Sequence, residues 1–375
     1  MKYSIKEVST RKELKNFVKF PNKLYKDNKF YVPQLESADL DALTKEKNHA
    51  FEYCDAKYWL AYDENGKIVG RIAGIINHQY NNKTGTNYAR FGWVDFIDDK
   101  EVVKLLFDTA EKWAKDNGMQ QICGPVGFLE FDASGVLVEG FDELPTAYGK
   151  YNHPYYEPRI LELGFTKEID WVEYRITTPC PIPEKYYRIA QIVEKRENLR
   201  VATIKNKREL KKYIGGVFDL INKVYDKLHG YSQLSQGQID DLIAQFVPQL
   251  NLDFVSIILN SDDKIVGFGV CLPSMSKALQ KAKGKLFPFG FIHILRALKK
   301  NDTIDTLLIG IDPDYQQKGV NAIIFREIAK GIEKYNIKYV ESTRELEDNF
   351  SVQNLWNKFD RRLHKRARSY IKEIK

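Results

Sequence analysis

The stretch from Ile309 to Ala322 has the residue types of an anion-binding loop. It reads Ile-Gly-Ile-Asp-Pro-Asp-Tyr-Gln-Gln-Lys-Gly-Val-Asn-Ala, an apolar strand that passes through a loop into a helix. The first amides of a helix have no internal partner and the helix dipole adds positive charge there, so a phosphate is a natural ligand. Gly319 permits close approach to the main chain, and Lys318 adds a full charge. The spacing differs from that of the nucleotide-triphosphate loop.

Apolar periodicity predicts the elements that position this loop. Thr306 to Ile311 is expected to form the strand before it, and Lys338 to Ser342 a second strand further on. Between them, apolar residues recur at helical spacing, at Ile324, Ile328, Ile332 and Tyr335. A short loop pattern gains weight only in a strand-loop-helix context, which is present here. The simpler alternative is an ordinary helix start with a glycine nearby.

The same stretch resembles motif A of the GNAT acyltransferase superfamily, Val-x-Pro-x-x-Gln/Arg-x-x-Gly-x-Gly/Ala. Ile311, Pro313, Gln316 and Gly319 match the pattern, while Asn321 replaces the last Gly or Ala. Asn tolerates a positive φ, so the turn is still expected to form. The resemblance implies that this loop holds the pyrophosphate of acetyl-CoA or another acyl-CoA, which is the co-substrate. The implied binding residues are Ile309, Ile311, Gln316, Gln317, Lys318, Gly319, Val320, Asn321, Ala322, Asn349 and Trp356.

A second resemblance concerns the segment from Asn349 to Phe359. It is similar to the GNAT pattern Asn-x-x-Ala-x-x-Leu-Tyr, in which Asn contacts the pantetheine arm and Tyr often protonates the departing thiolate. Trp356 stands at the Tyr position. An indole N–H donates a hydrogen bond but has no usable acidity, so the acid role is lost or carried elsewhere, and Trp356 is interpreted as structural.

Three carboxylates near this segment are candidates for the general base. Glu341 lies at the end of a predicted strand, and Glu345 and Glu347 follow it. To act, one of them needs a pKa raised by burial, or must take a proton through water from an ammonium nucleophile. Surface carboxylates are far commoner than catalytic ones, so the alternative for each of the three is an ordinary surface residue.

Two short motifs recur along the chain at nearly the same offset. Val8 to Phe17 recurs as Ile204 to Tyr213, and Gly66-Lys-Ile-Val-Gly70 recurs as Asp263-Lys-Ile-Val-Gly267. A period this long indicates duplicated domains rather than a solenoid, and 375 residues suffice for two cores. With the resemblance, the expected fold is α/β (α+β), with two GNAT-like domains, each a mixed, largely antiparallel sheet flanked by helices.

The expected boundaries follow from a proline-rich segment, Thr177 to Pro183. Residues 1–176 are predicted to form a GNAT-like domain with a degenerate phosphate loop. Residues 177–198 are predicted to be a linker with a bridging helix, and 199–375 a GNAT-like domain that binds acyl-CoA. The second copy is expected to open with a strand from Leu199 to Ile204.

The two copies differ where a phosphate would bind. The first copy has no glycine loop after Gly92, and Asp98 with Glu101 is expected to form a capping box that satisfies the helix amides. The first domain is therefore predicted not to bind coenzyme A in the usual way. Its glycine-rich segment, Cys123 to Tyr156, is too long for an ordinary connection. It is expected either to supply one wall of the substrate site or to be scaffold, with a poorly ordered loop as the alternative.

Two basic stretches stand out. From Lys264 to Asn301 there is no acidic residue, and lysines and arginines surround the aromatic run Phe287 to His293. Such a stretch can cover an acyl chain, touch a membrane surface or lie near phosphates, although a solvated helical face is commoner. The second is Arg361 to Arg368. A net charge of +7 does not by itself indicate nucleic-acid binding.

Other chemistries lack their residues. The six histidines and four cysteines show no metal-ligand spacing, and there is no Gly-x-Ser-x-Gly motif. Few, scattered cysteines suit free thiols in a reducing compartment, and the start Met1-Lys-Tyr-Ser lacks a signal peptide's apolar core. No apolar run reaches membrane-spanning length. The expected location is the cytoplasm, with no metal and no transmembrane segment.

The resemblance therefore predicts an acyl-CoA-dependent N-acyltransferase, most simply an N-acetyltransferase, acting on an unidentified small-molecule or peptide amine. One alternative is a Fem-type aminoacyl or peptidyl transferase, which also pairs GNAT-like domains and needs an RNA-binding surface; Arg361 to Arg368 is the hint for it. Another is a non-catalytic acyl-CoA sensor or scaffold, which Trp356 favours. The acceptor, the acyl length and the oligomeric state are left open.

Overall fold

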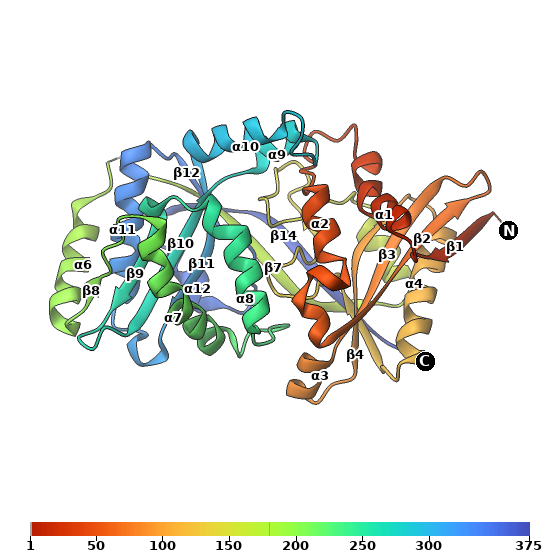
Figure 1. Ribbon diagram of the computed structural model, residues 1–375, viewed down its shortest axis with the longest axis horizontal. Coiled ribbons are helices and arrows are strands. Elements are labelled where there is room, and N and C mark those ends of the chain that lie inside the picture. The colour runs from red at the N-terminus through yellow and green to blue at the C-terminus, as the bar shows by residue number, and fades with distance from the viewer. Residues whose placement is uncertain (1, 180) are drawn as a thin grey trace.

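Two similar halves share one continuous sheet with helices on both of its faces (Figure 1). The computed structural model describes residues 2–179 and 181–375. The first half contains β1 (Tyr3–Glu7), α1 (Arg11–Leu24), α2 (Glu36–Ala42), η1 (Lys45–Lys47), η2 (His49–Glu52), β2 (Cys54–Asp63), β3 (Ile68–Asn77), α3 (His78–Thr84), β4 (Tyr88–Phe96), α4 (Lys100–Asp116), β5 (Gln121–Gly124), β6 (Val136–Glu139), α5 (Tyr156–Glu162) and β7 (Thr166–Thr177).

The second half repeats this order after the helix α6 (Glu184–Glu197). Its elements are β8 (Arg200–Val201), α7 (Lys207–Tyr225), α8 (Gln236–Phe246), η3 (Val247–Gln249), η4 (Leu252–Phe254), β9 (Val255–Leu259), β10 (Ile265–Pro273), α9 (Ser276–Ala282), α10 (Gly290–Lys299), β11 (Thr303–Ile311), η5 (Pro313–Tyr315), α11 (Val320–Tyr335), β12 (Tyr339–Glu341), β13 (Glu345–Leu346), α12 (Phe350–Gln353), η6 (Asn354–Trp356) and β14 (Asp360–Glu373). The opening strand β8 is shorter than the predicted 199–204.

The first repeated motif is a helix start in both halves. Thr10 caps α1 and forms a capping box with Glu13. At the matching point, the side chain of Asn206 accepts hydrogen bonds from the amides of Arg208 and Glu209 at the start of α7. Satisfying these orphan amides fixes where each helix begins, so the two copies open in the same way.

The second repeated motif ends in a glycine that lets a helix lie close to the sheet. A Cβ at Gly70 would lie 2.7 Å from Leu106 of α4, and a Cβ at Gly267 would lie 2.9 Å from Val320 of α11. Any larger residue would push the helix away. The repeat therefore marks equivalent helix-sheet contacts, α4 on β3 and α11 on β10.

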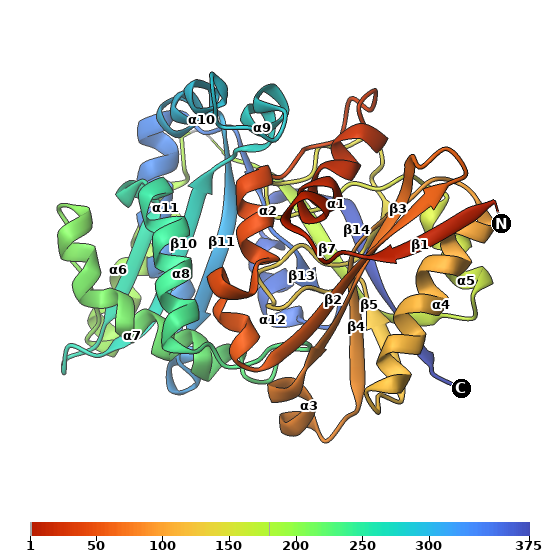
Figure 2. The same cartoon turned by 45° about the vertical axis from the view of Figure 1, so that its right-hand side comes forward.

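The final strand of each half pairs with strands of the other half. In the described residues the main order is β1-β2-β3-β4-β5-β14-β7-β12-β11-β10-β9-β8. β14, the last strand of the chain, pairs with β5 and β6 of the first half, and β7 pairs with β12 of the second. Both chain ends consequently lie in the first half (Figure 2). The predicted boundaries stay predictions, and the sheet runs unbroken across them.

Candidate active site

A cleft opens where β11 and β12 separate. Thr303–Asp305 pair in parallel with Tyr339–Glu341, but β11 continues to Ile311 while its other edge stays paired with β10. Residues 306–309 of β11 line a cavity of about 230 Å³ that begins at this point. The strand divergence therefore creates the space, and β11 provides one wall.

Both halves contribute to this cavity. Glu130, Phe131 and Tyr148 come from the long segment between β5 and α5 of the first half, while most of the remaining lining comes from the second half. The contact between the halves is direct, because Arg344 Nη2 donates a hydrogen bond to the carbonyl of Asp132 at 2.6 Å. The cavity wall is mostly apolar, so its few charged groups stand out.

Glu345 is the candidate base that lines the cavity. Trp356 Nε1 donates a hydrogen bond to Glu345 Oε1 at 2.6 Å, and the other oxygen, Oε2, is buried and has no hydrogen-bond partner within the described residues. Burial raises the pKa of Glu345 to about 7, although the Trp356 hydrogen bond opposes this. A carboxyl with that pKa and a free oxygen can accept a proton near neutral pH.

Trp356 and Asn349 also line the cavity, and their predicted role in binding coenzyme A stays a prediction. The segment that carries them forms only two short helical turns, α12 and η6. Trp356 is buried against Phe325, with ring centroids 5.7 Å apart, while its N–H binds Glu345. The interpretation of Trp356 as merely structural is therefore too narrow, because it positions a candidate base.

Glu341 is held away from the cavity by basic groups. It is buried on β12, with Oε2 2.8 Å from His364 Nε2 and Oε1 3.4 Å from Arg175 Nε. Burial would raise the pKa of Glu341, but the neighbouring His364 imidazole and nearby cations outweigh it and lower the pKa. A carboxylate stabilised in its charged form is a weak base.

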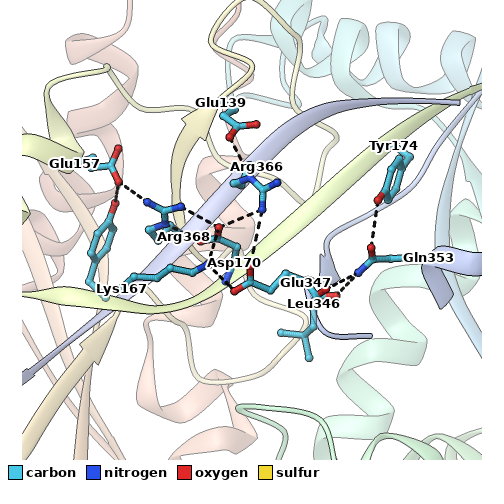
Figure 3. Close-up of polar contacts among 11 residues, drawn as sticks. Glu139, Glu157, Lys167, Asp170, Tyr174, Leu346, Glu347, Gln353, Arg366 and Arg368 are labelled. Carbon is cyan, nitrogen blue, oxygen red and sulfur yellow. Dashed lines mark hydrogen bonds and ion pairs between the residues drawn. The ribbon is translucent and has the colours of Figure 1, made fainter. Parts of the chain in front are cut away.

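Glu347 belongs to an ion cluster on β7 and β14, drawn in Figure 3. Lys167 Nζ lies 2.7 Å from Glu347 Oε1, and the amide of Asp170 donates to the same oxygen at 3.1 Å. The carboxylate of Asp170 binds Arg366 and Arg368 in turn. These contacts satisfy Glu347 as a structural residue, and it does not line the described cavity.

The proposed phosphate loop has an uncapped helix end. Gly319 is the N-cap residue of α11 with φ of 88°, and no side chain caps this helix. Lys318 and Gln317 are exposed, and Gln317 also has a positive φ. Asn321 lies in the first turn of α11, so the positive φ considered for it is not needed. The free amides and the exposed lysine fit a phosphate group.

On its inner side the loop is braced by α6. Arg196 Nη2 donates to the carbonyl of Lys318 at 2.7 Å, and a Cβ at Gly319 would lie 3.0 Å from Val193. On the neighbouring strand, the hydroxyl of Tyr225 donates to the Ile309 carbonyl at 3.1 Å. Gln316 Nε2 donates to the carbonyl of Ile311 at 3.2 Å and ties the loop to β11.

The corresponding helix of the first half is capped by a carboxylate. The cap is Asp99, whose side chain accepts from the amides of Glu101 and Val102. The prediction that Asp98 forms a capping box was wrong, since Asp98 binds Arg159 instead. The physical consequence is the one expected: a negative charge already satisfies these amides, and it would repel a phosphate.

The first half also fills its own strand divergence. β4 and β5 pair over three residues, and then the amide of Val126 donates to the carbonyl of Phe91 at 2.8 Å. The carbonyl of Val126 lies so near Gly92 that an added Cβ would be 2.6 Å from it. The chain after β5 therefore covers the edge of β4. The equivalent edge of β11 in the second half stays free.

The basic cluster near the C-terminus is largely neutralised. It lies on β14, where Arg362 binds Glu143, Lys365 lies 2.6 Å from Glu173, and Arg368 binds Asp170. A basic surface for nucleic acid needs unpaired cations. These contacts remove the hint of an RNA-binding surface that the sequence offered.

Glu130 and Arg344 are charged cavity residues that the sequence did not single out. Glu130 is half-buried, and the loss of water around its carboxyl raises its pKa, against the opposing charge of Arg344. Only the unusual length and glycine content of the Cys123–Tyr156 segment gave a signal for this region. Which of its residues reach the other half depends on the tertiary contact.

The described residues bear on three further points. Within 2–179 and 181–375, no three His, Cys, Asp or Glu side chains gather as metal ligands would. Among the described helices, none has both the length and the apolar character that crossing a bilayer requires. Cys54, Cys123 and Cys271 are buried free thiols, and Cys180 lies outside the described residues.

Comparison with known proteins identifies the fold. No family model matches the chain. It is 28% identical to Protein YghO of Escherichia coli over 97% of this chain and 94% of that protein. It is 29% identical to a bacterial ceramide synthase of Caulobacter vibrioides over 79% of this chain and 76% of that one.

A solved tandem GNAT protein from the clavulanic acid biosynthesis pathway superposes with a TM-score of 0.58 at 10% identity, covering 100% of this chain and 99% of its own. At that identity, the similarity concerns the fold. The repeated motifs, the diverging strands and this superposition agree, and over its whole length the chain has the tandem GNAT fold.

Proposed function

We propose that the protein is an acyl-CoA-dependent N-acyltransferase whose acceptor is a long-chain amine. The observation that carries the proposal is Glu345, a buried carboxyl with a pKa of about 7 and a free oxygen, in a mostly apolar cavity between diverging strands. A base of this kind is useful where an ammonium ion must lose its proton before it can attack a thioester.

The apolar lining favours substrates with hydrocarbon chains. A second cavity of about 80 Å³ adjoins the first, shares Phe131, Phe246 and Leu308 with it, and is lined by apolar side chains. Burying each methylene contributes about 0.8 kcal/mol, so an alkyl chain gains affinity in such a space. One relative is named a ceramide synthase, and a ceramide is the amide of a long-chain amine with a fatty acid.

The second half is the proposed site of the acyl donor. The loop amides between Gln317 and Ala322, with Lys318, would hold the pyrophosphate, and the edge of β11 from Ile309 to Ile311 would lie beside the pantetheine arm. The donor supplies an activated thioester, so no covalent intermediate with the protein is required. The first half, whose amides are capped and whose divergence is filled, supplies one wall of the cavity.

The proposed reaction divides the work among few residues. Glu345 takes a proton from the ammonium group, directly or through one water, and Trp356 orients the carboxylate that does so. The freed amine attacks the thioester carbonyl, the C–N bond forms, and the C–S bond breaks. As the amide forms, the attacking nitrogen loses a second proton and the departing thiolate takes one up; with a pKa of about 8.5 for a thiol, this step needs no strong acid.

The test compares two neighbouring carboxylates. Thiol release from palmitoyl-CoA and acetyl-CoA is followed with a long-chain and a short-chain amine. We expect Glu345→Gln to lower kcat/KM at least a hundredfold, while Glu347→Gln, a matched change outside the cavity, lowers it less than threefold. Unchanged turnover in Glu345→Gln would refute the base assignment. Binding of acyl-CoA without transfer to any amine would favour the alternative of a non-catalytic acyl-CoA sensor.

A further inference from the structure

α9 and α10 form a positively charged surface without ion-pair partners. Between Lys264 and Asn301 the chain has no acidic residue. Seven exposed cations lie in this stretch, and none forms an ion pair within the described residues: Lys277, Lys281, Lys283, Lys285, Arg296, Lys299 and Lys300. The C-terminal basic cluster, by contrast, is paired internally. The α9–α10 surface therefore has charge available for an external anion.

The same surface exposes large apolar side chains. Phe287 and Phe289 are 76% and 69% exposed, and on α10 Phe291 and Leu295, one helical turn apart, also face solvent. The opposite face of α10 is anchored, because Ile294 and its neighbours pack against the cluster of Met275 and Leu279. Leaving aromatic rings in water is unfavourable, and a patch of this kind usually has a partner.

α9 and α10 lie together along the upper edge of the molecule, near the junction of the two halves (Figure 1 and Figure 2). Gln280 of α9 donates to the carbonyl of Lys29 in the first half, which adds another exposed cation beside the surface. The exposed apolar side chains and the unpaired cations thus belong to one segment, which contacts the first half.

We propose that the α9–α10 surface binds an anionic lipid bilayer. Exposed aromatic side chains favour the boundary between headgroups and acyl chains, and lysine and arginine side chains attract anionic headgroups. A helix with one anchored face and one apolar face, flanked by cations, lies in the plane of such an interface. An acidic protein partner would account for the cations but not for the adjoining Phe287 and Phe289.

The location also links the bilayer to the cavity. α10 ends at Lys299, three residues before Asp302. The carbonyl of Asp302 accepts a hydrogen bond from the amide of Lys338. The carbonyl of Lys338 in turn accepts one from the amide of Thr178. Thr178 lines the cavity. A long-chain amine could therefore pass from the membrane to the site without crossing much water. This consequence rests on the proposed function, whereas binding to the bilayer does not.

The test measures co-sedimentation with vesicles. Phosphatidylcholine vesicles with about 30 mol% phosphatidylglycerol are compared with phosphatidylcholine alone, at about 0.1 M and about 0.5 M salt. We expect partitioning to be at least tenfold stronger on the anionic vesicles at low salt. Phe287→Ser with Phe289→Ser should lower it at least tenfold, and Lys281→Glu with Lys285→Glu should do the same.

The chain offers a matched control on α6. Ile189 and Ile192 are 45% and 52% exposed, but acidic residues such as Glu194 and Glu197 interrupt the charge of that helix. Ile189→Ser with Ile192→Ser should leave partitioning within twofold of the unaltered protein. Thermal unfolding of every variant confirms folding independently of acyl transfer.

Three results would overturn the proposal. One is equal loss of partitioning in the α6 and the phenylalanine variants, and another is binding that ignores lipid charge. The third is a dimer that Phe287→Ser with Phe289→Ser converts to a monomer, since a second copy would then cover the surface. Absence of acyl transfer with vesicle binding intact would count against the proposed function alone.

Discussion

Replacing Trp356 by Phe removes the hydrogen bond to Glu345 and keeps most of the ring volume. The bond is made at 2.6 Å to a buried carboxyl and lowers its pKa. A hydrogen bond to a charged group contributes about 1.5–3 kcal/mol, and one pKa unit corresponds to about 1.4 kcal/mol. The pKa of Glu345 should therefore rise from about 7 by roughly 1–2 units.

This shift has a clear signature in the pH dependence of kcat/KM. Raising the pKa means that less Glu345 is ionised at pH 7, so the rate there should fall roughly 5- to 50-fold. It should recover as the pH increases, because the carboxylate forms again above its new pKa. The acidic limb of the profile should move up by roughly 1–2 units.

Phe325→Leu is the matched control. Phe325 packs against Trp356 without touching the hydrogen bond, so it should alter stability but leave the acidic limb in place. A rate loss in Trp356→Phe that is constant across the pH range would refute the reasoning. It would mean that the indole acts on substrate position rather than on the ionisation of Glu345.

Three other predictions follow from the same contacts. Glu345→Gln should be inactive, yet at pH 8 its free energy of unfolding in urea should exceed that of the unaltered protein by up to about 3 kcal/mol. The reason is that folding raises the pKa of this carboxyl from 4.5 to about 7 and so disfavours its charged form. The gain in stability should vanish at pH 4, where the carboxyl is protonated in both the folded and the unfolded state. Gly319→Glu should weaken coenzyme A binding, measured by calorimetry, more than tenfold, or by over about 1.4 kcal/mol. Gly164→Glu, at a glycine with a similar φ of 85° and open space around it, should not weaken binding. Equal affinities of Gly319→Glu and the unaltered protein would refute the assignment of the phosphate loop. A fragment that starts at Glu184 lacks β7, to which β12 and β14 both pair, so it should give no cooperative thermal transition, and a stable, active fragment would contradict the shared sheet.

The sequence by itself determined the local features of this protein. The cap residues Thr10 and Asn206 lie next to the amides that they bind, and the hairpin motifs ending in Gly70 and Gly267 repeat at short range. The strand, the loop and the helix α11 around Gly319 also follow from neighbouring residues. Propensity, capping and periodicity act within a few residues, and this is why the duplication and the strand-loop-helix unit could be predicted, while the expected fold also rested on the resemblance to the GNAT motifs.

Only the tertiary structure showed which of the three carboxylates is the best candidate for the general base. Glu341, Glu345 and Glu347 lie within seven residues of the sequence, and all three looked alike there. Their environments differ because Glu341 is paired with His364 and Glu347 with Lys167 of β7, whereas Glu345 faces Trp356 and an apolar cavity. A pKa depends on burial and on charges brought from far along the chain, and no local pattern encodes these.

The exchange of final strands was likewise decided by tertiary structure. β14 carries the basic residues 361–368, and in the sequence they read as a free cationic surface. Pairing β14 with β5 and β7 buries or neutralises much of that charge and brings Glu130 to the same cavity as Glu345. Strand order depends on contacts between distant segments, so the sequence revealed both halves, and only the folded sheet showed which residues of each half line the shared cavity.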